Sequence, residues 1–247
     1  MKSEDIFMSD KEHRVVVSIG SKGSYKTTLM LNYIKIKYKN YDEFHLVLPA
    51  YKTASNGEQY AFLKQLKNVY IYDKYNELVS QSVSKHVNGK RNIFYGIDDA
   101  TSSGIDISKD QTLLHLITTT RHSHCQIWLC LHACRRSLCV PIRSNIDYLF
   151  LHSISNAKVL EAVYEEFASI KMSKQEFYKL YNERETKIII FILKPGNNII
   201  DNSVPDWKLF NYKEPIKVET QKPFSNNGFQ SKKGFLKGIL SFHNKNK

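Results

Sequence analysis

One stretch near the N-terminus, residues 15–32, constrains the fold of this 247-residue chain more than any other. A β-branched apolar run over residues 15–19 ends at Gly20, and a short glycine-containing loop closes on Lys26. The apolar spacing after this loop predicts a helix over residues 28–38. A strand, a glycine-rich loop and a helix in this order are typical of a phosphate-binding loop, because backbone N–H groups and the helix N-terminus both attract phosphate oxygens.

The loop matches the fingerprint G-x-x-x-x-G-K-[ST] at Gly20, Lys26 and Thr27, whereas Tyr25 stands in place of the second glycine. Gly23 supplies another permissive backbone position. We predict that Lys26 contacts the β- and γ-phosphates of a nucleotide and that Thr27 holds Mg²⁺. The predicted nucleotide-binding residues are Gly20, Ser21, Lys22, Gly23, Ser24, Tyr25, Lys26, Thr27 and Thr28. Two alternatives stay open: a glycine-rich turn with an incidental lysine, and a degenerate loop that binds nucleotide without hydrolysis.

A second motif, residues 92–100 (NIFYGIDDA), is an apolar strand that ends in two adjacent carboxylates. In phosphate-loop enzymes such a strand lies beside the loop and delivers an Asp to the Mg²⁺ shell, while the next acid orients and deprotonates the attacking water. We therefore assign Asp98 to the metal and Asp99 to the water. The alternative is an acidic pair that only caps the following helix.

Strand and helix patterns alternate along most of the remaining chain. The predicted strands are residues 44–48, 69–73, 126–131, 146–151 and 187–193, and the predicted helices are residues 59–66, 75–86, 110–122, 156–169 and 173–185. This alternation predicts an α/β fold in which helices flank a mostly parallel central sheet. His132 directly follows one strand, so we expect it at the carboxyl edge of the sheet, near the γ-phosphate. A purely structural histidine is the alternative.

The composition points to a polyanionic partner. Lys and Arg number 36 against 24 Asp and Glu, which gives a formal charge of +12 and favours nucleic acid over a merely solvated basic surface. We expect a soluble intracellular protein, because no apolar stretch reaches the ~20 residues of a membrane helix and no signal-peptide core is present. Four cysteines lie near three histidines, yet Cys125 and Cys130 are expected on opposite faces of one strand, so reduced thiols are favoured over a zinc site.

Four blocks in sequence order, GSKGSYKT, FYGIDDA, TTRHSHCQIWLCLHA and PIRSNIDYLFLHSIS, resemble the genome-packaging ATPases of the FtsK–HerA superfamily. The poxvirus-type group of viruses with double-jelly-roll capsids is the most similar, and the Lys-, Asn- and Tyr-rich composition suggests a virophage. The resemblance covers residues 14–193. It implies a RecA-like core that uses ATP and Mg²⁺, assembles as a homo-oligomeric ring (a pentamer or hexamer), and works in the virus factory of the host cytoplasm or in the virion.

The resemblance also implies roles for three further residues. His132 stands where the family commonly has a glutamine that senses the γ-phosphate. Arg121 and Arg143, the second of which lies near Asn145, match arginine positions of the superfamily. In a ring, one of them is expected to complete the site of the neighbouring subunit. An ordinary surface or DNA-contacting arginine is the alternative for each.

The C-terminal part has a different character. We expect an ATPase core over residues 1–195 and a basic extension over residues 196–247. From residue 211 onward there are eight lysines against two glutamates, with phenylalanines spaced among them. This pattern favours contacts with DNA or with a capsid vertex protein. A flexible tail and a membrane-surface helix over residues 232–242 are alternatives.

Taken with the resemblance, the sequence predicts an ATP-hydrolysing motor that moves double-stranded viral DNA into a preformed capsid and contacts the DNA backbone rather than the bases. A translocase or helicase of the same fold without a capsid is one alternative. A nucleotide-binding DNA or capsid adaptor without turnover is the other.

Overall fold

The computed structural model describes residues 13–51, 58–99, 106–134, 138–183, 188–193 and 199–201. Eight strands form one sheet in the order β3-β2-β4-β5-β1-β6-β7-β8. The strands are β1 (Val15–Ile19), β2 (Glu43–Val47), β3 (Val69–Tyr72), β4 (Ile93–Asp98), β5 (Cys125–Leu131), β6 (Tyr148–Leu151), β7 (Ile189–Ile192) and β8 (Ile199–Asp201). The first six run parallel, whereas β7 is antiparallel to β6 and β8 is antiparallel to β7. The predicted mostly parallel α/β sheet is confirmed.

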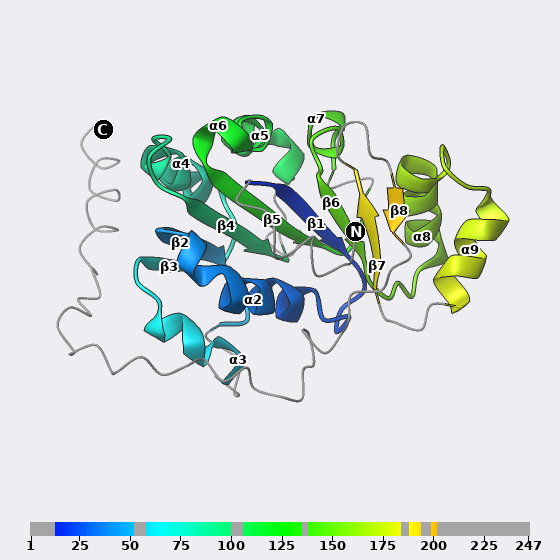
Figure 1. The fold of residues 1–247 in the computed structure, drawn as a ribbon, viewed down its shortest axis with the longest axis horizontal. Coiled ribbons are helices and arrows are strands. Elements are labelled where there is room, and N and C mark those ends of the chain that lie inside the picture. The colour runs from blue at the N-terminus through cyan, green and yellow to red at the C-terminus, as the bar shows by residue number, and fades with distance from the viewer. Residues whose placement is uncertain are drawn as a thin grey trace, which may run out of the picture. The chain divides into compact units, whose positions relative to one another are not determined.

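Helices cover both faces of this sheet (Figure 1). The helical elements are α2 (Lys26–Lys37), η1 (Tyr38–Asn40), α3 (Glu58–Ala61), η2 (Phe62–Gln65), α4 (Glu77–His86), η4 (Ile107–Lys109), α5 (Gln111–Thr118), α6 (Thr120–Ser123), α7 (Val140–Arg143), α8 (Ala157–Val163), η5 (Tyr164–Ala168) and α9 (Lys174–Glu183). Residues of α2, α3 and η2 pack in one core, and residues of α4, α5, α7, α8 and α9 pack in the other. Among the described residues, no helix combines the length and hydropathy needed to cross a membrane.

The central strands are buried on both faces, as expected for parallel strands between two helical layers. In β1, Val15, Val17 and Ile19 belong to one core and Val16 belongs to the other. The fully buried Ser18 accepts a hydrogen bond from Trp128 Nε1 at 3.1 Å, so its hydroxyl has a hydrogen-bond partner inside the core that contains Val16. This arrangement leaves only the strand ends for function.

Two predicted helices are modified in the structure. Asp110 caps α5 by accepting bonds from two backbone N–H groups, but the helix predicted to reach residue 122 breaks at Thr119. The hydroxyls of Thr118 and Thr119 both donate to the His115 carbonyl, which gives the backbone a partner outside the regular helix pattern. The helix predicted over residues 156–169 begins as α8 and continues as a π-helical turn, η5.

The cysteines are free thiols. Cys125 and Cys130 lie in different cores, which confirms that they occupy opposite faces of β5. Burial raises the pKa of Cys125 to about 12, so this thiol is protonated and a poor metal ligand. Within the described residues, no cysteine belongs to a group with the geometry of a metal site.

One sequence expectation concerns a part of the chain that is largely not described. The basic extension expected over residues 196–247 falls outside the described residues except for β8. That strand pairs with β7, so the sheet continues past residue 195, where the core was expected to end. The division into core and extension stays a prediction.

Candidate nucleotide site

The phosphate loop, residues 20–27, connects the carboxyl end of β1 to α2. Gly20 N–H donates to the Leu131 carbonyl at 3.1 Å, and Ser21 N–H donates to the Ser153 carbonyl at 2.9 Å. Leu131 ends β5 and Ser153 follows β6, the two strands that flank β1. The loop is therefore fixed to three adjacent strand ends.

Gly20 and Tyr25 explain how this loop keeps its shape with only part of the fingerprint. A Cβ on Gly20 would lie 2.5 Å from Ser24 Oγ and 2.6 Å from His152 Cβ, so this position requires glycine. Tyr25 has φ 68° and ψ 20°, a left-handed conformation that glycine adopts easily and that costs other residues roughly 1–2 kcal/mol. The tyrosine thus takes the backbone conformation expected of the missing glycine, and its side chain is 44% exposed.

Lys26 folds back onto its own loop. Its Nζ donates to the carbonyls of Gly20 at 2.8 Å and Ser21 at 2.9 Å, and it lies 3.5 Å from His132 Nδ1. Burial lowers the pKa of Lys26, while the acidic groups Asp98 and Asp99 act in the opposite direction. An ammonium group held beside the loop carbonyls is close to where phosphates bind in such loops.

Thr27, in the first turn of α2, meets Asp98 at the end of β4, although β4 and the strand before the loop, β1, are not neighbours. The sequence predicts that the acidic strand lies beside the phosphate loop, but β5 intervenes between β4 and β1. Even so, Thr27 Oγ1 donates to Asp98 Oδ2 at 2.8 Å. Asp98 is 8% exposed, and burial raises its pKa while the Thr27 hydroxyl lowers it. A hydroxyl and a carboxylate in contact are the hard oxygen ligands that Mg²⁺ prefers, so these two residues fit the predicted metal site.

The intervening strand β5 brings His132 into the site. Its Nδ1 lies 3.1 Å from the Gly20 carbonyl, and its Nε2 lies 3.4 Å from Asp99 Oδ1. Asp99 itself has φ 50°, a left-handed conformation that Asp tolerates better than most residues and that directs the chain away after β4. The imidazole thus connects the phosphate loop to the acid predicted to activate water.

The other predicted loop residues differ in their surroundings. Ser21 Oγ lies 2.9 Å from Ser155 Oγ and accepts a bond from Ser155 N–H at 2.8 Å. Lys22 is exposed at the loop, and Thr28 is half-buried in the first turn of α2. Ser24 Oγ is buried and has no hydrogen-bond partner among the described residues. An unsatisfied hydroxyl in a phosphate loop fits a site that receives an oxygen-rich ligand.

His152 is a loop-supporting residue that the sequence analysis missed. It is fully buried, its Nδ1 lies 2.8 Å from the Ser24 carbonyl, and burial lowers its pKa to about 3. The neutral ring therefore donates from Nδ1 and holds the loop from behind. Its position directly after an apolar strand was the available signal, because the carboxyl ends of parallel strands meet at one edge.

Arg121 and Arg143 are not brought to this edge. Arg121 precedes β5 and lies 3.6 Å from Asp147 Oδ1, and Asp147 precedes β6. Arg143, which also precedes β6, lies 3.1 Å from Glu166 Oε2. Both arginines therefore lie toward the amino ends of the parallel strands, opposite the phosphate loop of their own chain.

Comparisons with solved structures match this fold to viral packaging enzymes. The genome packaging NTPase B204 of Sulfolobus turreted icosahedral virus 2 in complex with AMP superposes with a TM-score of 0.57 at 14% identity, over 78% of this chain and 98% of that chain. Its complex with ATP-γS gives 0.55 at 13% identity, over 75% and 94% of the two chains. The DNA-packaging ATPase B204 of Sulfolobus turreted icosahedral virus gives 0.56 at 13% identity, over 78% and 97%.

No protein-family model and no curated protein matches the sequence. At identities this low, the structural likeness is evidence for the fold and not for a particular activity. The chain has the same α/β fold as these viral packaging NTPases, a mostly parallel sheet flanked by helices.

Proposed function

We propose that this chain is an ATP-hydrolysing motor that moves double-stranded viral DNA into a preformed capsid. The observation that carries the proposal is the gathering of Lys26, Thr27, Asp98, Asp99 and His132 at one edge of the sheet. A binding site for nucleotide alone does not need a second acid linked to the phosphate loop. The likeness to B204, which spans 98% of that packaging NTPase, supports the packaging role.

Each residue has a role in this proposal. Lys26 contacts the β- and γ-phosphates, and Thr27 and Asp98 hold Mg²⁺, which neutralises charge on the phosphates when bound. Asp99 orients the attacking water and accepts its proton. His132 touches both the loop and Asp99, so it is placed to relate the state of the γ-phosphate to the position of the base.

The arginines act only between subunits in this proposal. Because Arg121 and Arg143 lie at the far edge from their own phosphate loop, either one reaches a nucleotide only in a neighbouring subunit of a ring. Subunits with Arg121→Ala keep an intact phosphate loop, and subunits with Lys26→Ala keep both arginines. Mixing the two inactive forms should restore part of the turnover if Arg121 acts in trans, and the same test applies to Arg143→Ala. Unchanged turnover in both single variants would contradict this role.

DNA and capsid are the proposed partners. The formal charge of +12 supports binding to the DNA backbone, which carries no sequence information and suits a motor that accepts any genome. The virus factory of the host cytoplasm and the virion are the proposed sites of action, with a capsid or vertex protein as the docking partner.

The decisive experiment measures ATP hydrolysis by the full chain with and without long duplex DNA, alongside Lys26→Ala and Asp99→Asn. We expect DNA-stimulated turnover that both substitutions abolish, with nucleotide binding retained in Asp99→Asn. ATP binding without turnover at any protein concentration would instead favour the adaptor. Association with capsid protein then separates a packaging motor from a translocase or helicase that works without capsids.

A further inference from the structure

A second cluster of ligand-type side chains lies far from the phosphate loop. Glu43 is the first residue of β2, His45 lies two residues further along the same strand, and His86 is the last residue of α4. Glu43 and His45 share one face of β2 with Val47, which belongs to the core that α4 covers. The cluster therefore joins the amino end of a parallel strand to the carboxyl end of the helix above it.

We propose that Glu43, His45 and His86 form a binding site for a divalent first-row transition-metal ion such as Zn²⁺. One ligand atom from each residue lies within 4.8 Å of the other two. Glu43 Oε2 lies 3.5 Å from His45 Nε2 and 2.6 Å from His86 Nδ1. Tetrahedral zinc with bonds of ~2.0–2.1 Å places its ligand atoms about 3.3 Å apart. Binding would therefore lengthen the distance between Glu43 and His86 by about 0.7 Å and shorten the distance between Glu43 and His45 by about 0.2 Å.

His45 provides the independent sign of a missing ligand. Its side chain is fully buried, and its Nε2 makes no hydrogen bond of good geometry among the described residues, since its nearest polar neighbour, Glu43 Oε2, lies 3.5 Å away. A neutral imidazole has one lone pair, and this lone pair is on Nε2 when Nδ1 donates to the Tyr72 hydroxyl. Buried polar atoms without partners are rare in proteins, and a metal ion on Nε2 would satisfy this one.

The surroundings of the cluster hold each ligand in place. His45 Nδ1 lies 3.0 Å from the Tyr72 hydroxyl, and the ring stacks on Tyr70 with centroids 4.7 Å apart. A hydrogen bond on the other ring nitrogen is the usual support of a metal-binding histidine. Arg91 pairs with Glu43 Oε1, which leaves Oε2 facing the two histidines. Burial alone would raise the pKa of Glu43, but the bonds from His86 and Arg91 lower it and keep the carboxylate ionised.

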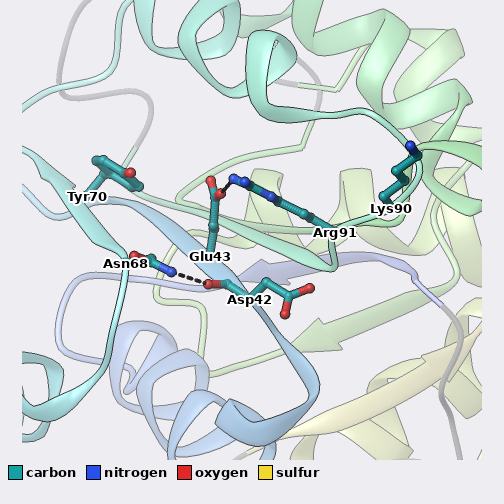
Figure 2. A pocket seen from close by; sticks show the side chains of 6 residues that line it. All are labelled: Asp42, Glu43, Asn68, Tyr70, Lys90 and Arg91. Atoms are coloured by element: carbon teal, nitrogen blue, oxygen red, sulfur yellow. Dashed lines mark hydrogen bonds and ion pairs between the residues drawn. The ribbon is translucent and has the colours of Figure 1, made fainter.

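A pocket opens beside Glu43, and neither His45 nor His86 is among the residues that line it. The pocket has a volume of about 400 Å³, and Figure 2 shows Glu43 reaching toward Arg91 at its wall with Tyr70 across from them. It is lined by Asp42, Glu43, Asn68, Tyr70, Lys90 and Arg91. The three ligands would leave an open coordination position for water. The last turn of α4 adds the negative end of the helix dipole, which favours a cation at His86.

The donor set selects the class of ion. Two imidazole nitrogens and one carboxylate suit zinc and its neighbours, whereas Mg²⁺ and Ca²⁺ prefer oxygen ligands alone. This site is therefore chemically distinct from the Mg²⁺ site proposed at Thr27 and Asp98. The competing explanation is a metal-free network in which Glu43 simply pairs with His86 and Arg91.

Zinc titration of the chelator-treated full chain, in competition with a chromophoric chelator, tests the proposal. We expect one equivalent of Zn²⁺, and a Kd raised at least about a hundredfold in His45→Ala and in His86→Ala. His115→Ala removes an exposed histidine of α5 outside the cluster and should leave binding unchanged. His86 sits at a helix end with its side chain 32% exposed, so His86→Ala should fold even where His45→Ala does not.

Two further measurements separate this site from the cysteines and from the bare network. Cobalt in place of zinc should give a spectrum without thiolate charge-transfer bands. Zinc at a hundredfold excess over Kd should raise the melting temperature of the wild type by about 5–11 °C, and that of His86→Ala by much less. The proposal would be overturned if the wild type bound no stoichiometric zinc. It would also be overturned if both histidine variants bound zinc with the same Kd as the wild type, or if the cobalt spectrum showed thiolate bands.

Discussion

The contact between Thr27 and Asp98 allows a direct test of the candidate site without nucleotide. Thr27→Val keeps the shape and β-branching of the side chain but removes the hydroxyl that donates to Asp98 Oδ2 at 2.8 Å. Valine and threonine have similar helix propensities, so the change isolates one hydrogen bond. Thr27→Ser is the matched control, because it keeps the hydroxyl and loses only a methyl group.

The expected magnitude follows from the burial of the acceptor. Asp98 is 8% exposed, so water cannot fully replace the lost donor. Hydrogen bonds to charged groups contribute about 1.5–3 kcal/mol, and we expect Thr27→Val to lower the free energy of unfolding by that amount. For a domain of this size, the melting temperature should fall by about 3–12 °C. The serine control should stay within about 1 kcal/mol of the wild type.

The pH dependence adds a second check. Burial raises the pKa of Asp98, so this group contributes stability below the ordinary carboxyl range and loses it as the pH rises through its folded-state pKa. The Thr27 hydroxyl favours the ionised form of Asp98. The difference in the free energy of unfolding between wild type and Thr27→Val is therefore largest above that pKa. This difference in stability should narrow as the pH falls through the raised folded-state pKa of Asp98.

Urea unfolding in Mg²⁺-free buffer measures these differences, and ATP turnover in Mg²⁺ measures the functional effect. Turnover in Thr27→Val should fall about tenfold to a hundredfold, because the metal loses one ligand. Valine and serine variants of equal stability at about pH 8 would refute the reasoning, since the hydroxyl would then contribute nothing to holding Asp98.

Substitutions at three further positions probe the phosphate loop and its contact with His132. Gly20→Ala places a methyl group 2.5 Å from Ser24 Oγ and 2.6 Å from His152 Cβ, so we expect a loss of about 1–3 kcal/mol in urea unfolding together with weaker ATP binding. Tyr25→Gly relieves the strain of a left-handed backbone but increases the entropy of the unfolded chain, so the free energy of unfolding should rise by up to about 1 kcal/mol. ATP affinity should stay within about threefold of the wild-type value. Loss of ATP binding would mean that the tyrosine ring contacts the nucleotide. His132→Ala should lower turnover by at least about tenfold at unchanged ATP affinity, with partial recovery in His132→Gln, and equal activity of all three proteins would argue against a coupling role.

Local patterns in the sequence predicted most of the strands and helices. The β-branched run before Gly20 and the apolar run before Asp98 each form a buried parallel strand. Their polar ends then converge because parallel strands share one carboxyl edge. The contact of Thr27 with Asp98 was predictable for this reason, although the two residues are 71 positions apart.

The order of strands and the long-range pairs were not predictable in the same way. Nothing in residues 126–131 indicates that β5 inserts between β1 and β4, since this depends on how the helices pack. The left-handed backbone of Tyr25 is fixed by the surrounding loop and not by tyrosine's own preference. The cluster of Glu43 and His45 left a weak signal, two polar residues on the buried face of a strand, but His86 joins them only through the packing of α4.

The position of Lys26 has a consequence for the release of nucleotide from the proposed ATPase. Its ammonium group donates to the Gly20 and Ser21 carbonyls, so a contact between Lys26 and a phosphate would form in exchange for these two hydrogen bonds. In the proposed motor, this exchange would reduce the net gain from the lysine–phosphate contact, and it would also help ADP to leave. A loop whose carbonyls can bind the lysine in place of a phosphate would suit a motor that must release its product on every turnover.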